Sequence, residues 1–347
     1  MDRPDSPLNS TAAPPAKSVS RLIKSAFGYL LAAACLMGVF HDIHVGRLLE
    51  HITTTNWWWV ALAIVFDILS YLCQGWRWQL LLRPISNLSV LRTTQAIYAG
   101  LFANEVLPMR FGELVRAYLV SRWISARFVT IIPSMAVERL FDGVWLGVAI
   151  GLTAMFVPLP KDLLEAGDIL GIIVLIATGL FVYVIFRKQK APAEQAAEPS
   201  NGWKPLQMVR SFIEHLASGL RAIGTSRFVY LALSLSLVFL VLQALAFWLI
   251  LWGYGLRLSF WIGFVVLLIV HLGTAIPNAP ANLGTYQFFC VVGLTLFGVD
   301  KTLATGFSVV VFVLFTVPLW VIGFVALSRS GMTLAEIRDE INRVRRQ

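Results

Sequence analysis

Long uninterrupted runs of apolar residues, separated by short polar and basic segments, dominate this chain. Six runs reach the roughly 20 residues needed to cross a bilayer: residues 22–40, 57 to about 78, 128–157, 168–186, 228–253 and 304–327. None shows the alternation over about ten residues that marks a membrane β-strand. The pattern therefore predicts an all-α, polytopic integral membrane protein with about six full spans.

Two further apolar runs, 90–107 and 259–276, are short and end in helix-breaking sequence. A full crossing by 90–107 would leave four arginines outside, against the positive-inside bias: Arg110, Arg116, Arg122 and Arg127. A re-entrant hairpin that returns to the cytoplasm removes this conflict. Irregular backbone at membrane depth needs surrounding protein or a water-filled cavity. We therefore expect the hairpin to line a cavity.

The two breaks, 104–113 (NEVLPMRFGE) and 273–287 (GTAIPNAPANLGTYQ), share a pattern. In each, Pro precedes polar or small residues, then Gly, then a polar residue that opens the next helix. The predicted topology brings the first hairpin in from the cytoplasm and the second from outside. Such pairs are typical of a transporter-like inverted repeat with a site at mid-membrane; the alternative is two ordinary loops between full spans. The predicted hinge residues are Pro108, Gly112, Pro277, Pro280 and Gly284.

Polar segments flank and divide the expected transmembrane domain, residues 21–328. Residues 1–20 are rich in Pro, Ser and Ala and predict a disordered cytoplasmic tail, and residues 187–204 predict a polar linker. The apolar stripe in 205–223 predicts an amphipathic helix, either on the cytoplasmic interface or packed on the transmembrane core. Residues 329–347 predict a basic amphipathic tail.

Composition and charge agree with a membrane location. The chain is 58% hydrophobic and 14% charged, whereas soluble domains carry about 25% charged residues. The net charge of +9 comes from bases in the segments between spans, which indicates topology rather than nucleic-acid binding. We expect a multi-pass protein of the inner (plasma) membrane with both termini cytoplasmic. Three cysteines lie inside apolar runs without CxxC spacing, so neither a disulfide nor a metal site is expected.

Charged residues near the first break are the first candidate site. Charge at membrane depth costs at least about 2.5 kcal/mol and marks functional candidates. Glu113 and Arg116 share a helix face three residues apart, and Arg110 precedes them. With Asn104 and the helix N-terminus at Gly112 they form a candidate phosphate site. The alternative is an ion pair that fixes a turn at the interface.

A second charged set, Glu138, Arg139 and Asp142, lies on the span 128–157. Two acids with one arginine need another base, and Arg110 or Arg116 of the hairpin is the expected partner. The set either binds substrate directly or locks the hairpin to the span. Gly143, Gly147 and Gly151 continue this span at four-residue spacing and predict a close-packing surface.

Polar residues near the second break, Asn282 and Gln287, could line the other half of the cavity. Asp67 lies in the middle of the second span without a neighbouring base and predicts either a distant arginine partner or a proton relay. His271 stands alone on an apolar run, where a hydrogen-bonded structural histidine is the expected role.

Sequence motifs for catalysis or nucleotide binding are not found. The chain contains no Walker A loop, no HExxH, no GxSxG and no metal-spaced His/Cys cluster. We therefore expect a protein that is not an enzyme and has no cofactor. Energy for any transport must come from a gradient, from a partner, or from none in a scramblase.

Three segments resemble the lysylphosphatidylglycerol synthase transmembrane family: Asn104–Arg116, Glu138–Asp142 and Pro280–Gly298. The resemblance covers about residues 20–330 and implies a flippase-like translocase for an anionic or aminoacylated phospholipid or a lipid-linked molecule. Family members often have Gly-Gly and Glu where this chain has Ala281-Asn282 and Gln287. The soluble synthase domain of fused members has no counterpart here, so lysyl transfer is not expected.

Two other functional classes remain open from the sequence. One is an integral-membrane transferase that acts on lipid-linked substrates, although the predicted outer loops are short for such an enzyme. The other is an accessory subunit that organises a lipid-modifying enzyme. The expected partners are membrane phospholipids or lipid-linked molecules, together with a lipid-modifying enzyme or a second copy of the chain.

Overall fold

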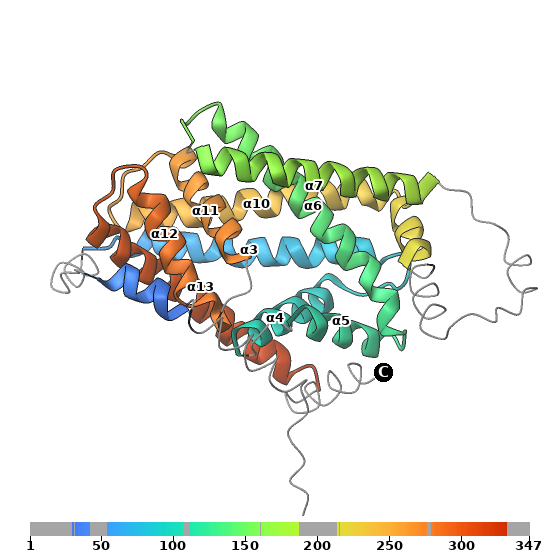
Figure 1. The fold of residues 1–347 in the computed structure, drawn as a ribbon. Helices are drawn as coiled ribbons and strands as arrows, with labels where there is room; N and C mark the ends of the chain where they lie inside the picture. The colour runs from blue at the N-terminus through green and yellow to red at the C-terminus, as the bar shows by residue number, and fades with distance from the viewer. Residues whose placement is uncertain are drawn as a thin grey trace, which may run out of the picture.

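The computed structural model describes residues 30, 32–41, 54–106, 112–159, 161–186, 214, 216–275 and 279–331, and every regular element within them is helical (Figure 1). The predicted tail 1–20, the linker 187–204 and residues 332–347 lie outside these ranges. So do residues 22–29 and 31 of the first predicted span, residues 205–213 and 215 of the predicted helix 205–223, and the candidate residues Pro108, Arg110 and Pro277.

Four helices of the described residues are long and apolar enough to cross a membrane. They are α3 (Trp57–Leu82), the Gly167–Phe186 part of α7 (Lys161–Phe186), α10 (Phe228–Gly253) and α13 (Lys301–Ser328). This confirms a polytopic membrane protein and four of the six predicted spans. Helix α6 (Phe128–Ala154) has 27 residues but carries the charged set described below. Of the first predicted span, residues 32–40 are helical.

Helices α3 and α10 form an antiparallel pair at the centre of the molecule (Figure 1). The Asn56 N–H donates to the Gly253 carbonyl at 2.8 Å, which joins the start of α3 to the end of α10. At the other end, the Arg83 guanidinium lies over the Phe228 ring at 4.3 Å. Small side chains such as Ala63 and Ala244 are buried in this core, which lets the two backbones approach closely.

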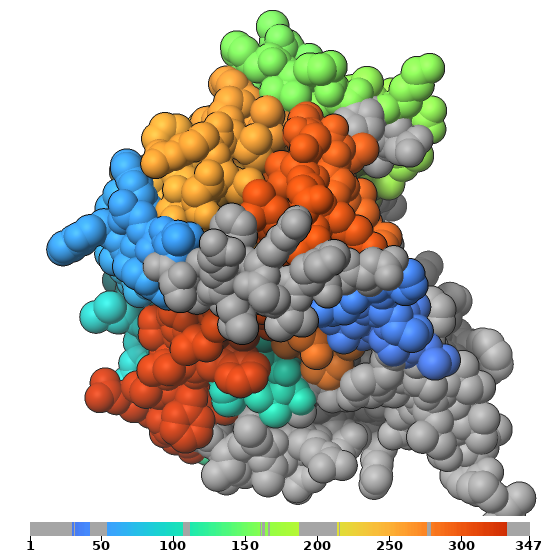
Figure 2. Space-filling view, turned by 90° about the vertical axis from the view of Figure 1, so that its left-hand side faces the viewer, coloured from blue at the N-terminus to red at the C-terminus, as the bar shows by residue number. Residues whose placement is uncertain are grey.

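Helix α7 lies at the edge of the bundle and packs against α6. None of its residues in the span Gly167–Phe186 is buried. Figure 2 looks onto the end of the bundle at which α6 passes into α7, and the green residues of this region lie at its upper edge. The apolar surface of α7 is therefore what faces the lipid hydrocarbon.

The two broken segments each form a pair of packed helices. The first pair is α4 (Val90–Val106) and α5 (Gly112–Trp123), and the second is α11 (Phe260–Ala275) and α12 (Thr285–Thr295), with the 3₁₀ turn η2 (Pro280–Asn282) between them. At about 1.5 Å per residue even α4 is about 26 Å long, less than a hydrocarbon core of about 30 Å. Because α4 contacts η2, the break of the second pair reaches the first pair.

Gly112 lets α4 and α5 approach closely. A Cβ on Gly112 would lie 1.9 Å from the Gly100 carbonyl oxygen, and a Cβ on Gly100 would lie 2.6 Å from the Gly112 carbonyl oxygen. The Gly112 N–H also donates to Asn104 Oδ1 at 2.7 Å. The predicted hinge at Gly112 is thus the point at which the two backbones meet.

Replacing Gly112 by Ala is expected to lower the free energy of unfolding by about 1–3 kcal/mol, because the methyl group overlaps backbone that cannot move aside. Gly147→Ala is the matched control, since a Cβ there meets no described atom within 4 Å and Ala is the better helix former by about 1 kcal/mol. Thermal unfolding of both variants in detergent measures the difference. Equal melting temperatures would contradict the close approach.

At the second break, Gly284 has φ of +85°, a conformation that glycine adopts without strain. A Cβ at this position would lie 2.5 Å from the carbonyl oxygen of Ala32, so the helix over residues 32–40 packs on the second pair. The Gly284 N–H donates to Gln287 Oε1 at 2.7 Å and so caps the start of α12. Gly284 is therefore at a turn, as predicted.

Two packing predictions are corrected or refined around α6. A Cβ on Gly143 would lie 2.9 Å from Val174 Cγ2 of α7, but Gly147 and Gly151 meet no described residue. The predicted close-packing surface is therefore wrong for those two glycines. Helix α7 still approaches α6 beside them, since a Cβ on Gly167 would lie 2.8 Å from Ile150 Cγ2, but Gly147 and Gly151 do not face that contact. Residues 216–224 are helical and pack on the core, where Ile223 is buried and Gly219 approaches the Pro133 ring. This part of the predicted amphipathic helix follows the packed alternative.

Candidate functional site

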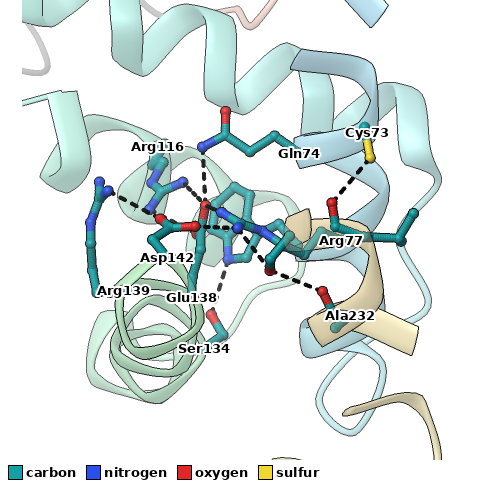
Figure 3. A network of polar contacts seen from close by, with 12 residues as sticks. Cys73, Gln74, Arg77, Arg116, Ser134, Glu138, Arg139, Asp142 and Ala232 are labelled. Carbon is teal, nitrogen blue, oxygen red and sulfur yellow. Dashed lines mark hydrogen bonds and ion pairs between the residues drawn. The ribbon is translucent and has the colours of Figure 1, made fainter. Parts of the chain in front are cut away.

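A buried carboxylate, Glu138 of α6, joins three helices (Figure 3). Its Oε1 accepts from Arg77 Nη2 of α3 at 2.6 Å, and its Oε2 lies 2.9 Å from Arg116 Nη2 of α5. Gln74 Nε2 of α3 donates to the same Oε1 at 3.1 Å. One side chain thereby ties the first helix pair and the central helix α3 to α6.

Further ion pairs extend this cluster to six charged residues. Arg77 also donates to Asp142 and, at 3.0 Å, to Ser236 Oγ of α10. Glu113 pairs with Arg116 at 2.6 Å and with Arg139, and Arg139 Nη1 lies 3.5 Å from Asp142 Oδ2. Three arginines thus balance three acids. Buried charge is tolerated only when it is paired in this way.

Burial divides the cluster into an inner and an outer part. The side chains of Arg77 and Glu138 are 0% exposed and that of Arg116 is 4% exposed. The Arg139 side chain is 57% exposed, and Glu113 and Asp142 are partly exposed. Arg77 and Glu138 are out of reach of a ligand and hold helices together, whereas Arg116 and the outer part line the cavity described below.

Arg77 was not among the predicted site residues. The sequence placed it at the inner end of the second span, where a basic residue is expected. The structure continues α3 to Leu82 and buries Arg77 within it. The spacing of Ser70, Gln74 and Arg77 could have indicated a buried role for Arg77. Steps of four and three residues put these three polar side chains on one face of the helix.

A cavity of about 720 Å³ opens beside the outer part of the cluster. Both broken segments reach it, through Asn104 and Gly112 of the first and Ala281 and Asn282 of the second. One side of the wall is charged, with Glu113, Arg116, Arg139 and Asp142. Another side is apolar, with Trp145, Leu146, Leu170, Phe239 and Leu240. Its volume is in the range of small-molecule binding sites.

The cavity brings together most of the predicted binding residues, and these are Asn104, Glu113, Arg116, Arg139, Asp142 and Asn282. The predicted hinge residue Gly112 also lines it. The predicted hairpin partner of the α6 acids is confirmed as Arg116. Glu138 lies behind the wall, and Gln287 is buried at the start of α12 with its oxygen on Gly284. Pro280 begins η2 near the cavity.

The charged wall of the cavity includes a guanidinium that an anion can reach. No group of three or more His, Cys, Asp or Glu side chains within the described ranges is arranged to hold a metal ion. Arg139 can present its guanidinium to a phosphate with parallel hydrogen bonds. Asn104 and Asn282 add amide groups from the two breaks, while the apolar wall accommodates hydrocarbon.

Comparison with known proteins shows the family to which this chain is similar. The model of the family described as lysylphosphatidylglycerol synthase TM region matches residues 24–323. A UPF0104 membrane protein of Methanothermobacter thermautotrophicus is 23% identical over 340 residues, which is 90% of this chain and 95% of the relative. A UPF0104 membrane protein of Methanocaldococcus jannaschii is 21% identical over 298 residues, 82% of this chain and 88% of the relative.

Proposed function

The chain belongs to the lysylphosphatidylglycerol synthase TM region family, and from this premise we propose that it is a flippase-like lipid translocase and not an enzyme. Its substrate would be an anionic or aminoacylated phospholipid, or a lipid-linked molecule, that moves between leaflets of the inner membrane. The observation that carries the proposal is the cavity of about 720 Å³ with one charged and one apolar wall. A site that binds a lipid needs a charged surface for the headgroup and an apolar surface for the acyl chains.

In this proposal the headgroup phosphate binds to Arg139. The guanidinium is held at the cavity by Glu113 and Asp142, yet 57% of its side chain stays exposed. Exposed ion pairs are worth at most about 1 kcal/mol, so a phosphate competes with the two acids easily. The acyl chains would extend out of the cavity beside Leu170, where α7 exposes its apolar surface to lipid.

The two helix pairs act as re-entrant hairpins in this proposal, related as an inverted repeat and accompanied by six full crossings. Each hairpin is too short to cross, and their breaks approach each other at the cavity. That arrangement matches discontinuous helices around a mid-membrane binding site. Alternating access would then move one hairpin against the other.

The distribution of arginines supports a cytoplasmic orientation for one end of the bundle. The ends of α3 and α5 and the starts of α4, α6 and α10 meet there, close to the end of α13. Among the described residues this end carries Arg83, Arg92, Arg122, Arg127, Arg227 and Arg329. The other end carries Lys161, Arg257 and Lys301. The positive-inside rule then places both termini in the cytoplasm.

Reconstitution into vesicles tests the translocase proposal. Vesicles of phosphatidylcholine with fluorescently labelled phosphatidylglycerol are expected to lose label asymmetry faster with the protein than without it. Addition of a membrane-impermeant quencher measures the fraction of label in the outer leaflet over time. Unchanged rates for every anionic lipid, together with specific binding to a lipid-modifying enzyme, would support the accessory-subunit alternative instead.

Site-directed cysteine labelling tests the hairpins. We expect Asn87→Cys and Ser125→Cys, before α4 and after α5, to react with an impermeant maleimide from the cytoplasmic side, and Ser259→Cys, before α11, from outside. The native Cys35, Cys73 and Cys290 are buried, so background labelling should be low. Labelling of positions 87 and 125 from opposite sides would mean that the first pair crosses the membrane.

A further inference from the structure

A second, smaller cavity of about 140 Å³ lies beside the large one. Asp67 of α3 lines it, together with Phe312, Phe315 and Thr316 of α13. The two cavities share wall residues from five elements, and these are Tyr71, Glu105, Gln243, His271, Ala281 and Asn282. Polar groups of the small cavity therefore continue without interruption into the wall of the large one.

Asp67 differs from every acid of the charged cluster, because it is buried without a basic side chain that would balance its negative charge. Its residue is 6% exposed, and within the described part of the chain its carboxylate has no hydrogen-bond donor or ion-pair partner. It lies ten residues after the start of α3, which is about 15 Å along the helix and close to the middle of a hydrocarbon core of about 30 Å. Arg77 is a further ten residues away and is held by Glu138 and Asp142.

The surroundings of Asp67 supply no permanent positive charge in the part of the molecule that the structure describes. Helix α10 contributes Gln243 and α13 contributes Thr316. The titratable groups that face it from the packed elements are Tyr71, Tyr98, Glu105, His271 and Tyr286. Glu105 accepts from Trp320 Nε1 at 3.2 Å, so a donor already holds that carboxylate.

A lone carboxylate in such a place costs several kcal/mol in its charged form. Binding of a proton to one carboxylate oxygen gives the neutral acid and removes this cost. When water enters the cavity, the charged form is solvated and the proton can leave. Opening and closing of the cavity would therefore release and bind one proton at Asp67.

We propose that Asp67 is a proton-binding site through which lipid movement in the large cavity is coupled to a proton gradient. The inference rests on the proposed translocase function and adds an energy source to it. His271 and Tyr71 in the shared wall connect Asp67 to the large cavity. No group of three or more His, Cys, Asp or Glu side chains that could hold a metal ion occurs among the described residues, whereas a single carboxylate is sufficient to bind a proton.

Infrared spectroscopy of the purified full-length protein tests the proton site without any transport. The wild type is expected to show the C=O absorption of a protonated carboxyl group at neutral pH, and Asp67→Asn is expected to lose it. Asp168→Asn is the matched control, because Asp168 is exposed on α7 and its loss should leave the absorption unchanged. A wild type without this absorption, or an Asp67→Asn variant that keeps it, would overturn the proposal.

Vesicles of phosphatidylcholine with labelled phosphatidylglycerol test the coupling. At one proton per lipid, each unit of imposed pH difference is expected to change the leaflet ratio of the label about tenfold in the wild type. Asp67→Asn should leave the ratio at one, Asp67→Glu should restore part of the response, and Asp168→Asn should behave as wild type.

The outcomes separate the two proposals. Lipid movement that ignores the pH difference, or that follows only a sodium gradient, would overturn proton coupling and leave the translocase function standing. If the wild type moves no labelled lipid under any gradient, the translocase proposal fails, and the infrared result still decides whether Asp67 binds a proton.

Discussion

Replacing Glu138 by Gln is expected to lower the free energy of unfolding by about 3–5 kcal/mol, the cost of removing one partner from a buried ion pair. Gln has the same shape but no charge, so Arg77 and Arg116 would lose the carboxylate that they share. Thermal unfolding in detergent, followed by tryptophan fluorescence and by size-exclusion chromatography, measures the loss. Poor recovery of a monodisperse protein would be the extreme form of the same result.

Two controls make the Glu138 result specific. Glu165→Gln makes the same chemical change at an exposed position of α7 and should leave the melting temperature within error. The double variant Glu138→Gln, Arg116→Gln should cost less than the sum of the single changes, because the two residues are in contact. Full stability of Glu138→Gln, combined with loss of lipid binding, would assign Glu138 to the substrate rather than to the fold.

Replacing Arg139 by Gln is expected to slow translocation of labelled phosphatidylglycerol roughly ten- to hundredfold, because a hydrogen bond to a charged group is worth about 1.5–3 kcal/mol. The melting temperature should change little, since the pairs of Arg139 are exposed. Initial rates in vesicles with equal amounts of protein measure the effect. Arg139→Gln is thus expected to lower the translocation rate and keep the melting temperature, whereas Glu138→Gln is expected to lower the stability of the fold.

Further variants show whether the effect depends on the cavity. Arg139→Lys should keep part of the rate, because Lys retains the charge but not the two parallel hydrogen bonds. Arg257→Gln removes an exposed arginine that lies over the Trp252 ring, outside the cavity lining, and should leave the rate unchanged. A wild-type rate for Arg139→Gln would remove Arg139 from the proposed binding site.

The charged cluster neutralises the three ionised residues near the middle of α6. Glu138 lies ten residues after the start of α6, about 15 Å along the helix. The apolar pattern alone could not show how that charge is neutralised. The neutralising positive charges are those of Arg77 and Arg116, which lie on two other helices.

Adjacent residues of one motif therefore have different roles. The sequence presented Glu138, Arg139 and Asp142 as one charged face, with substrate binding and structural locking as equal alternatives. In the structure, Glu138 points into the protein and Arg139 into the cavity. The geometry favours the structural lock for the first residue and the binding role for the second.

The apolar pattern and the breaks by themselves determined that the chain is an all-α, polytopic membrane protein with two interrupted helix pairs. They succeeded because the bilayer imposes length and polarity locally on each span. Charge balance also predicted that Arg110 or Arg116 pairs with the α6 acids, and the structure shows the pair of Arg116 with Glu138. Only the tertiary structure decided that Arg77 completes the cluster, that Gln287 caps a helix, and that Asp67 faces a cavity shared by both helix pairs. These contacts join residues far apart in the chain, and no local spacing specifies which helix faces meet.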